Sequence, residues 1–523
     1  MLKTIRFPAF VAALALAGCL GLAAPSRAQQ MDMSRVEALR AKGDVNGALQ
    51  AYGLLIQMGN AEMRYAALLG RADILMEQGK TDAAIADLTA AIKTDDKRAD
   101  AYRERGLAHA SAGRAEPAFE DFQAALKIAP DDRESYLGRA RLNLAQRELQ
   151  DAVRDFNIAI DMDGEDAGAF MDRGVTHAEL GMFKEAIDDF DDAIRLQPDM
   201  VAAVVQRAMV YSELGKSSRA LRDFSTALRM EPKNTRALVG RGQVYMDMDE
   251  PESAIADFTA ALAIDPKYID ALLGRAQALE DARQRDRAIA DYGAVLAIDK
   301  ANIGALHGRG VLLMQSGMPD RAIADFDAAL AADAKSPDVL ISRGQAKLDR
   351  GDAPGAIADY TAAAQADPES AAPIIARGRT YLMAGDFAKA EADLARIAAV
   401  APDNAYHALW LLLARFHGGK DGRAQLRAAA AGFDQKAWPM PLVGLFLSTV
   451  KFEDVMAAAR HKSPQVQRDQ LCEANFFVGH YALMAKQPKE AGNYFRASLA
   501  TKIAQFDEYR GARAELVRMG LKP

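Results

Sequence analysis

The side chains best placed to do chemistry form a regular lattice of arginine and aspartate. An arginine recurs every 34 residues, and an aspartate follows each one 16 residues later. Such groups form bidentate ion pairs, but an arginine row also suits carboxylate or phosphate ligands. Because a binding feature is rarely identical in ten copies, the sequence predicts a structural ladder of ion pairs, within one repeat or between neighbours. The arginines are Arg71, Arg105, Arg139, Arg173, Arg207, Arg241, Arg275, Arg309, Arg343 and Arg377, and the aspartates are Asp87, Asp121, Asp155, Asp189, Asp223, Asp257, Asp291, Asp325, Asp359 and Asp393.

The other reactive residue types show no catalytic or metal-binding arrangement. A Gly-Lys-Ser triplet at 215–217 resembles the end of a phosphate-binding loop, but Val210 stands where that loop needs glycine. The seven histidines have no metal-ligand spacing, and His109 and His177 occupy a repeat position that holds tyrosine in other copies, so we interpret them as packing residues. The sequence therefore predicts no catalytic, cofactor or metal site. An enzyme would need a catalytic cluster in 405–523, outside the regular repeats.

The same 34-residue period defines the elements that carry the lattice. A small residue follows each arginine, an alanine comes twelve residues later, and a large, mostly aromatic residue comes four residues after that. Apolar residues at i, i+3, i+4 and i+7 mark both halves of the unit as amphipathic helices. A unit this short cannot bury its apolar face alone, so ten units over 65–404 are expected to stack into a solenoid.

Glycine marks the break between the two helices in most units, where a left-handed C-terminal cap is easiest for a residue without a side chain. Arg147, Asp249 and Arg283 replace it in three units. We expect the turns at Arg147 and Arg283 to be strained or rearranged. Proline often follows the second helix, which it cannot continue.

These residues resemble the tetratricopeptide repeat family, whose unit is a 34-residue helix–turn–helix. The pattern RG…G…AIADF…AL…DP carries the resemblance over 65–404, although many members have apolar or aromatic residues in place of the Arg/Asp pair. One more unit is expected at 29–64 and another near 472–505. The resemblance implies an all-α, right-handed superhelical solenoid of stacked antiparallel helix pairs. Degenerate helical hairpins and a capping helix would close it over 405–523.

The resemblance also implies that the first helices line a concave groove for peptides. The inward positions are largely apolar, several are methionine, and acidic residues flank them, which suits an extended or helical peptide with apolar anchors and some basic residues. The alternative is that some of these apolar residues only contribute to packing between helices. The predicted groove residues are Leu137, Met171, Val205, Met209, Val239, Met246, Leu273, Met314, Ile341 and Ile375.

The C-terminal tail carries a second resemblance. From Trp438-Pro439 through CEANFFVGHYALMAKQPKEAGNYFRASL it is similar to the end of NlpI-type periplasmic repeat lipoproteins. That likeness implies a non-catalytic adaptor that brings cell-wall hydrolases to a processing protease. The alternative is a scaffold of an envelope polysaccharide-secretion complex. Protein or peptide clients are expected, whereas a net charge of −7 without a basic stripe argues against nucleic acid.

Residues 1–28 have the pattern of a secretory signal peptide, with Lys3 and Arg6 before an apolar run. Cleavage after Ala28 would release a soluble periplasmic protein. Leu16-Ala17-Gly18-Cys19 instead resembles a lipobox, in which lipidation of Cys19 would give an outer-membrane lipoprotein facing the periplasm. If cleavage follows Ala28, Cys472 is the only cysteine left and no intrachain disulfide can form. Cys472 is then expected to be a buried thiol.

Overall fold

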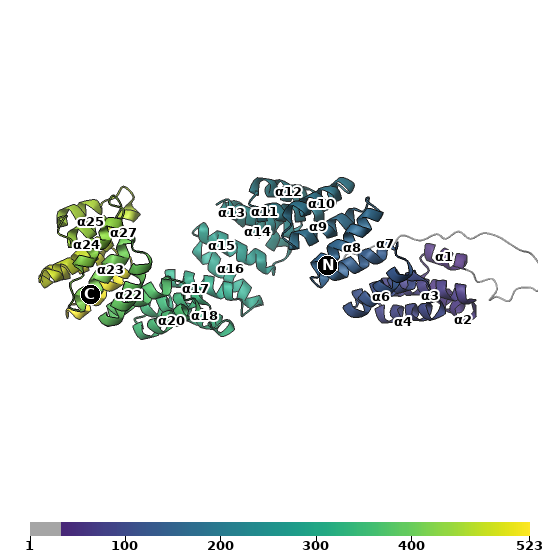
Figure 1. Ribbon diagram of the computed structural model, residues 1–523, viewed down its shortest axis with the longest axis horizontal. Coiled ribbons are helices and arrows are strands. Elements are labelled where there is room, and N and C mark those ends of the chain that lie inside the picture. Colours follow the sequence, from purple (N-terminus) through teal and green to yellow (C-terminus); the bar gives the residue numbers. More distant parts are fainter. Residues whose placement is uncertain (1–32) are drawn as a thin grey trace, which may run out of the picture. The chain divides into compact units, whose positions relative to one another are not determined.

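The computed structural model describes residues 33–523, and every regular element in that range is a helix (Figure 1). Within each of its two compact units, consecutive helices contact one another in pairs, and successive pairs pack together. This confirms the all-α repeat fold expected from the 34-residue period. The leader at 1–28 and Cys19 lie outside the described residues, so both cleavage predictions stay predictions.

The repeats from 65 to 404 each contribute two helices. The first helices are α3 (Ala61–Glu77), α5 (Ala99–Ser111), α7 (Arg133–Ala145), α9 (Ala167–Glu179), α11 (Val201–Glu213), α13 (Thr235–Asp247), α15 (Ile269–Asp281), α17 (Ile303–Gln315), α19 (Pro337–Asp349) and α21 (Ala372–Ala384). The second helices are α4 (Thr81–Thr94), α6 (Ala115–Ile128), α8 (Leu149–Met162), α10 (Phe183–Leu196), α12 (Ser217–Met230), α14 (Pro251–Ile264), α16 (Arg285–Ile298), α18 (Pro319–Ala332), α20 (Ala353–Ala366) and α22 (Phe387–Val400). Ahead of them, α1 (Met33–Ala41) and α2 (Val45–Met58) fall in the expected unit at 29–64.

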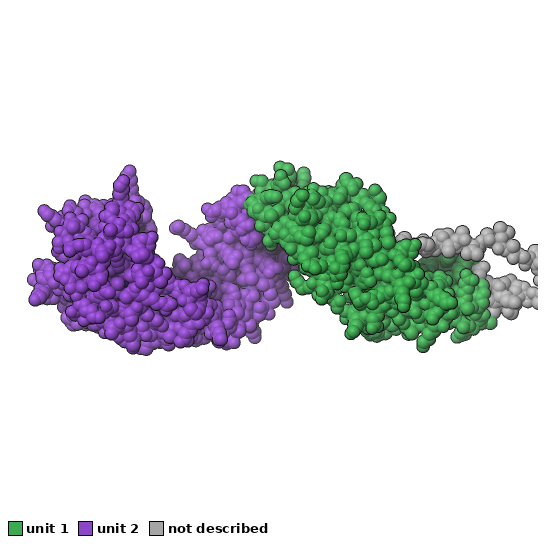
Figure 2. Space-filling model, viewed as in Figure 1, with its two compact units in different colours: residues 1–237 green, residues 238–523 purple. Residues whose placement is uncertain are grey.

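The chain divides into two compact units (Figure 2). The first ends at Ala237 and the second runs from Leu238 to Pro523. The division falls inside the array of repeats, within the first helix of the repeat that carries Arg241.

In some repeats the large residue of the second helix packs against glycines of two first helices. A Cβ added at Gly106 would lie 3.0 Å from the ring of Phe122, and one added at Gly138 of the next repeat would lie 2.5 Å from it. Phe258 is held in the same way between Gly242 and Gly274. Gly106 and Gly242, which follow Arg105 and Arg241, are thus required to be small by the large side chain of the second helix, which explains why a small residue recurs there with the same period.

The turns between paired helices share one geometry, including those without glycine. Gly79 has φ of 70°, and Arg147 and Arg283 have φ of 63° and 57°. The capping bonds also match, because the Lys80 amide donates to the Leu75 carbonyl at 2.8 Å and the Glu148 amide donates to the Asn143 carbonyl at 2.8 Å. Of the two expected alternatives, strained or rearranged, the structure therefore shows the strained one. The strain remains, since arginine adopts a left-handed conformation there.

Arg147→Gly and Arg283→Gly are each expected to raise the free energy of unfolding by about 0.5–1 kcal/mol, since glycine relieves the left-handed strain but loses more backbone entropy. Urea unfolding followed by circular dichroism measures the change. Glu148→Gly is the matched control, because Glu148 has φ of −81° and gains nothing from glycine. A glycine variant no more stable than its parent would show that these turns are unstrained.

Residues 405–523 form a helical cap around one large core. Two of its helices, α27 and α28, form a hairpin in which a Cβ at Gly479 would lie 2.5 Å from Phe495, as in the regular repeats. Cys472 is a free, buried thiol with its Sγ 3.3 Å from Ser498 Oγ, as expected. The elements of this region are α23 (Ala405–His417), α24 (Arg423–Ala429), the 3-10 helix η1 (Ala430–Gly432), α25 (Met440–Phe446), α26 (Phe452–Ala458), α27 (Pro464–Met484), α28 (Pro488–Ala500) and α29 (Asp507–Arg518).

Candidate interaction surface

Every arginine of the lattice forms a bidentate ion pair with the aspartate of its own repeat. In Arg207, Nε and Nη2 donate to the two carboxylate oxygens of Asp223 at 2.7 and 2.9 Å. Arg105 and Asp121 show the same geometry at 2.9 and 2.7 Å. The prediction of a structural ion-pair ladder is confirmed, and the pair lies within one repeat. The remaining pairs are Arg71–Asp87, Arg139–Asp155, Arg173–Asp189, Arg241–Asp257, Arg275–Asp291, Arg309–Asp325, Arg343–Asp359 and Arg377–Asp393.

The third nitrogen of several arginines reaches back to the preceding repeat. Its acceptor is the side chain 16 residues earlier, for example Asn157 for Arg173 at 2.8 Å and Asp327 for Arg343 at 2.7 Å. One guanidinium therefore joins two second helices of successive repeats through one first helix. Sequence reasoning missed this bond, although polar residues recurring two places after the aspartate were a usable signal. The further acceptors are Thr89, Asp191, Thr259 and Thr361.

Hydrogen bonding to Asp257 raises the pKa of Arg241, although burial opposes it, and other arginines of the lattice show the same effect. In one repeat a histidine joins the pair, because His177 Nδ1 lies 2.8 Å from Asp189. This corrects the interpretation of His177 as a packing residue only. The N–H groups of the lattice arginines donate to side chains of the repeats themselves, so few of them are free to bind a ligand.

The inner side of the array is the side of the first helices. Within the first compact unit, α3 contacts α5, α5 contacts α7, and α7 contacts α9; α17 contacts α19 in the second. Two of the predicted groove residues, Leu137 and Val205, are only 2% and 3% exposed and belong to the helix packing. Met209 is 36% exposed. The half-buried members of the set are Met171, Val239, Met246, Leu273, Met314, Ile341 and Ile375.

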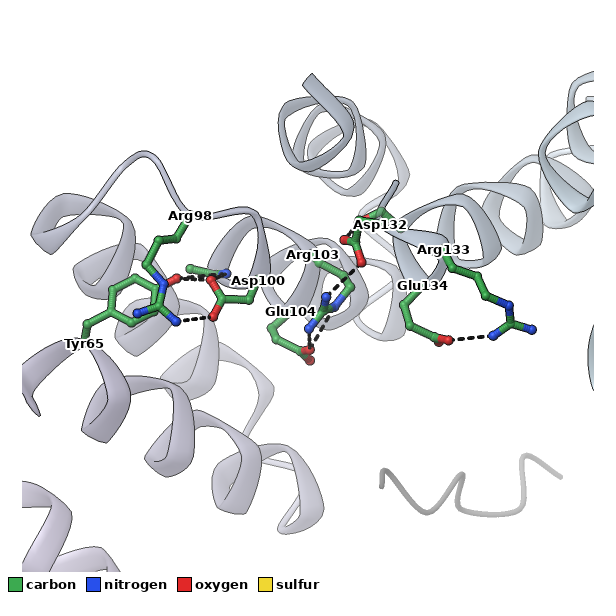
Figure 3. A network of polar contacts seen from close by, with 10 residues as sticks. Tyr65, Arg98, Asp100, Arg103, Glu104, Asp132, Arg133 and Glu134 are labelled. Atoms are coloured by element: carbon green, nitrogen blue, oxygen red, sulfur yellow. Dashed lines mark hydrogen bonds and ion pairs between the residues drawn. The ribbon is translucent and has the colours of Figure 1, made fainter. Parts of the chain in front are cut away.

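The inner side of the first repeats is built from ion pairs (Figure 3). Arg103 occupies a position that is apolar in most other repeats, and it contacts Glu104 and Asp132, each at 3.0 Å. Arg98 pairs with Asp100 at 2.8 Å and covers the ring of Tyr65. Burial raises the pKa of the Glu104 carboxyl, which the charge of Arg103 opposes. This part of the surface therefore satisfies its own charges and offers no apolar strip.

Further along, the last position of the first helices carries a recurring exposed carboxylate. Within the described residues, Glu213 and Asp281 have no ion-pair partner. Six of the first helices end in such a residue, so the inner side has an acidic edge next to its methionines. These carboxylates are Glu77, Glu179, Glu213, Asp247, Asp281 and Asp349.

In the second compact unit, the C-terminal helix α29 packs against inner-side positions of α19 and α21. Arg510 pairs with Asp349 at 2.8 Å, and Asp507 pairs with Arg379 at 2.7 Å. Arg518 donates to the Leu382 carbonyl at 2.9 Å. The contacts join residues more than 120 positions apart, and no periodic signal in the sequence pointed to them.

Two of the cap's carboxyl groups with raised pKa values, Glu473 and Glu508, lie in α29 or close to it. Glu473 accepts hydrogen bonds from the Tyr406 hydroxyl at 2.7 Å and the Trp438 indole at 2.6 Å, and burial raises its pKa. Burial, with help from Asp507 and Glu473, raises the pKa of Glu508 to about 8. Because burial favours the protonated form of both carboxyl groups, protonation stabilises the docking of α29 and ionisation destabilises it.

The paired helices, their 34-residue spacing and their small-against-aromatic contacts define a helical repeat protein. Tetratricopeptide repeat models match residues 69–133, 137–201, 205–269, 307–371 and 347–415. Together these matches cover more than half of the chain, and the chain belongs to the tetratricopeptide repeat family. None of the curated proteins matches it.

Solved structures show likeness at the level of the fold. A tetratricopeptide repeat protein from Parabacteroides merdae is 21% identical with a TM-score of 0.38, over 47% of this chain and 98% of that one. YrrB, described as a TPR protein with an unusual peptide-binding site, is 20% identical with a TM-score of 0.31, over 35% of this chain and 95% of that one. A chain of the APC/C hetero-tetramer Cut9–Hcn1 is 16% identical with a TM-score of 0.38, over 72% and 82%. Among the described residues, no helix is both long and apolar enough to cross a membrane.

Proposed function

We propose that this protein is a non-catalytic interaction scaffold that binds a helical segment of a client protein on the inner side of its first helices. The observation that carries the proposal is the docking of α29, in which a helix of the same chain lies against α19 and α21 at inner-side positions. Membership of a family of stacked helix pairs supports it, because such arrays present extended binding surfaces.

The contacts of α29 define the chemistry expected of a client helix. Arg510 contacts the acidic edge at Asp349, while Asp507 contacts Arg379. In other repeats the acidic edge is retained, at Glu213 for example, and Met209 lies one helical turn before it. Methionine adapts its shape to apolar partners, so a client helix with apolar anchors and Arg or Lys residues fits this surface.

Met209→Glu is expected to reduce client recovery at least about tenfold, because an apolar anchor against a carboxylate loses more than 1.4 kcal/mol of binding free energy. Met230→Glu is the matched control, since Met230 is 42% exposed at the end of a second helix, against 36% for Met209. Crosslinking followed by quantitative mass spectrometry of recovered proteins measures the difference, with circular dichroism as the check on folding. Equal recovery by both variants would place the binding surface elsewhere.

The proposed location is the periplasm, and the proposed clients are cell-wall hydrolases or proteases. The leader-like residues 1–28 and the tail's similarity to NlpI-type adaptors support this, whereas the alternative role in polysaccharide secretion rests on family resemblance alone. Cell fractionation tests the location, and recovery only from the cytoplasm would reject it. Recovery of glycosyltransferases in place of hydrolases would favour the alternative.

A further inference from the structure

Three side chains from separate helices of the cap bring metal-ligating atoms together. His417 ends α23, His480 lies in α27 and Glu515 lies in α29. His417 Nε2 is 3.3 Å from His480 Nδ1 and 3.3 Å from a Glu515 carboxylate oxygen. One ligand atom from each residue lies within 4.8 Å of the other two. His480 and Glu515 are buried, at 1% and 3% exposed, and His417 is half-buried.

His417 Nε2 lies between two groups that can accept a hydrogen bond, His480 Nδ1 and the Glu515 carboxylate. If His417 Nε2 carries a proton, that single hydrogen has to serve both His480 Nδ1 and the Glu515 oxygen; if it does not, its lone pair lies 3.3 Å from a carboxylate oxygen. The other nitrogen of His480, Nε2, is buried without a hydrogen-bond partner and lies among the rings of Phe476 and Phe495. The ligand atoms of His417 Nε2, His480 Nδ1 and Glu515 lie within 4.8 Å of one another, so a cation among them would accept all three lone pairs and leave the proton of His480 on Nε2.

We propose that His417 Nε2, His480 Nδ1 and the Glu515 carboxylate bind one divalent transition-metal ion of the Zn²⁺ class. Two imidazoles and one carboxylate form a common ligand set for such ions, and their lone pairs then point at a single cation. Ligand atoms around a tetrahedral Zn²⁺ lie about 3.3 Å apart, given bonds of about 2.0–2.1 Å. The two observed separations of 3.3 Å match that edge. A fourth position remains for water or a further donor.

The surrounding residues hold the three ligands in place. Arg518 donates to a Glu515 oxygen and also to the Leu382 carbonyl at 2.9 Å, which fixes the carboxylate and neutralises its charge. The ring of His417 stacks on Phe387 at 5.1 Å between centroids. Such supporting contacts orient metal ligands in known sites. Because Glu515 belongs to α29, a bound ion would fasten this helix to α23 and α27.

Zinc titration of the full-length protein, stripped with a chelator and dialysed, tests the site by isothermal titration calorimetry. We expect one Zn²⁺ per chain, with affinity weakened at least about 100-fold in His480→Gln and in Glu515→Gln. His461→Gln is the matched control, since His461 is exposed and outside the cluster, and its affinity should equal that of the parent. Co²⁺ should give the intense visible absorption of a tetrahedral site in the parent and the control only.

Hydrogen exchange gives a second measurement that does not depend on affinity. Zn²⁺ should slow exchange of the α29 amides in the parent but not in His480→Gln, and circular dichroism checks that each variant is folded. If His480→Gln does not fold, His417→Gln takes its place in the comparison. Absence of stoichiometric binding by the parent would overturn the proposal. Binding that survives equally in the ligand variants would also overturn it.

Discussion

Arg207→Ala is expected to lower the free energy of unfolding by about 2–3 kcal/mol, because it leaves a buried carboxylate without its partner. The side chain of Asp223 is 9% exposed and accepts both of its strong hydrogen bonds from Arg207. The same guanidinium contacts Asp191 of the preceding repeat, so its loss also removes a bond between repeats. Burial opposes the positive charge of Arg207, but hydrogen bonds to Asp223 and Asp191 raise its pKa overall.

Urea unfolding of Arg207→Ala and of a surface control measures this contribution. Arg195→Ala removes an exposed pair with Asp192, which is expected to contribute under about 0.5 kcal/mol. Arg207→Leu combined with Asp223→Tyr should recover most of the lost stability, since a paired apolar replacement leaves no buried charge. If Arg207→Ala unfolds at the same urea concentration as Arg195→Ala, the ladder does not stabilise the array.

The contacts that could be predicted from the sequence are those that recur in every repeat. The pairing of Arg71 with Asp87 repeats every 34 residues, and so does the packing of a large residue such as Phe122 against a small one such as Gly106. A contact made ten times leaves ten aligned residues in the sequence. The same period also placed the turn at Arg147 correctly. The backbone there has the left-handed conformation of the glycine turns in other repeats, although arginine does not favour it.

Contacts that occur only once in the molecule produce no recurring residue pattern in the sequence. Arg510 and Asp349 are 161 residues apart, and His417 and His480 are 63 apart, so neither pair shows a local spacing that a motif could capture. The burial of individual side chains on the inner side could not be predicted either, for a different reason. Leu137 and Ile341 occupy the same repeat position, yet Leu137 is buried and Ile341 is half-buried, because exposure there depends on the side chains of adjacent repeats.

The docking of α29 is expected to weaken as pH rises from about 4.5 to about 8. The pKa of Glu508 is raised by burial, and further by Asp507 and Glu473, from 4.5 to about 8, against the lowering effect of Arg379. The folded protein therefore keeps this carboxyl protonated where the undocked helix has released the proton. A raised folded pKa contributes stability that is complete below pH 4.5 and is lost as pH rises through 8. Across this interval the loss is on the order of 3–5 kcal/mol.

Glu508→Gln isolates this contribution, because glutamine has nearly the shape of the protonated acid and does not titrate. Native-state hydrogen exchange of the α29 amides, corrected for the intrinsic exchange rate at each pH and measured with a chelator present, gives the local free energy of opening. In the parent this free energy should fall between pH 5 and pH 8, whereas in Glu508→Gln it should change much less. Glu490→Gln, at an exposed position of α28, should behave as the parent does. A parent whose α29 opens with the same free energy at pH 5 and pH 8 would show that Glu508 is ionised in place. In that case Arg379, the basic group that contacts the neighbouring Asp507, would be the side chain that compensates its charge.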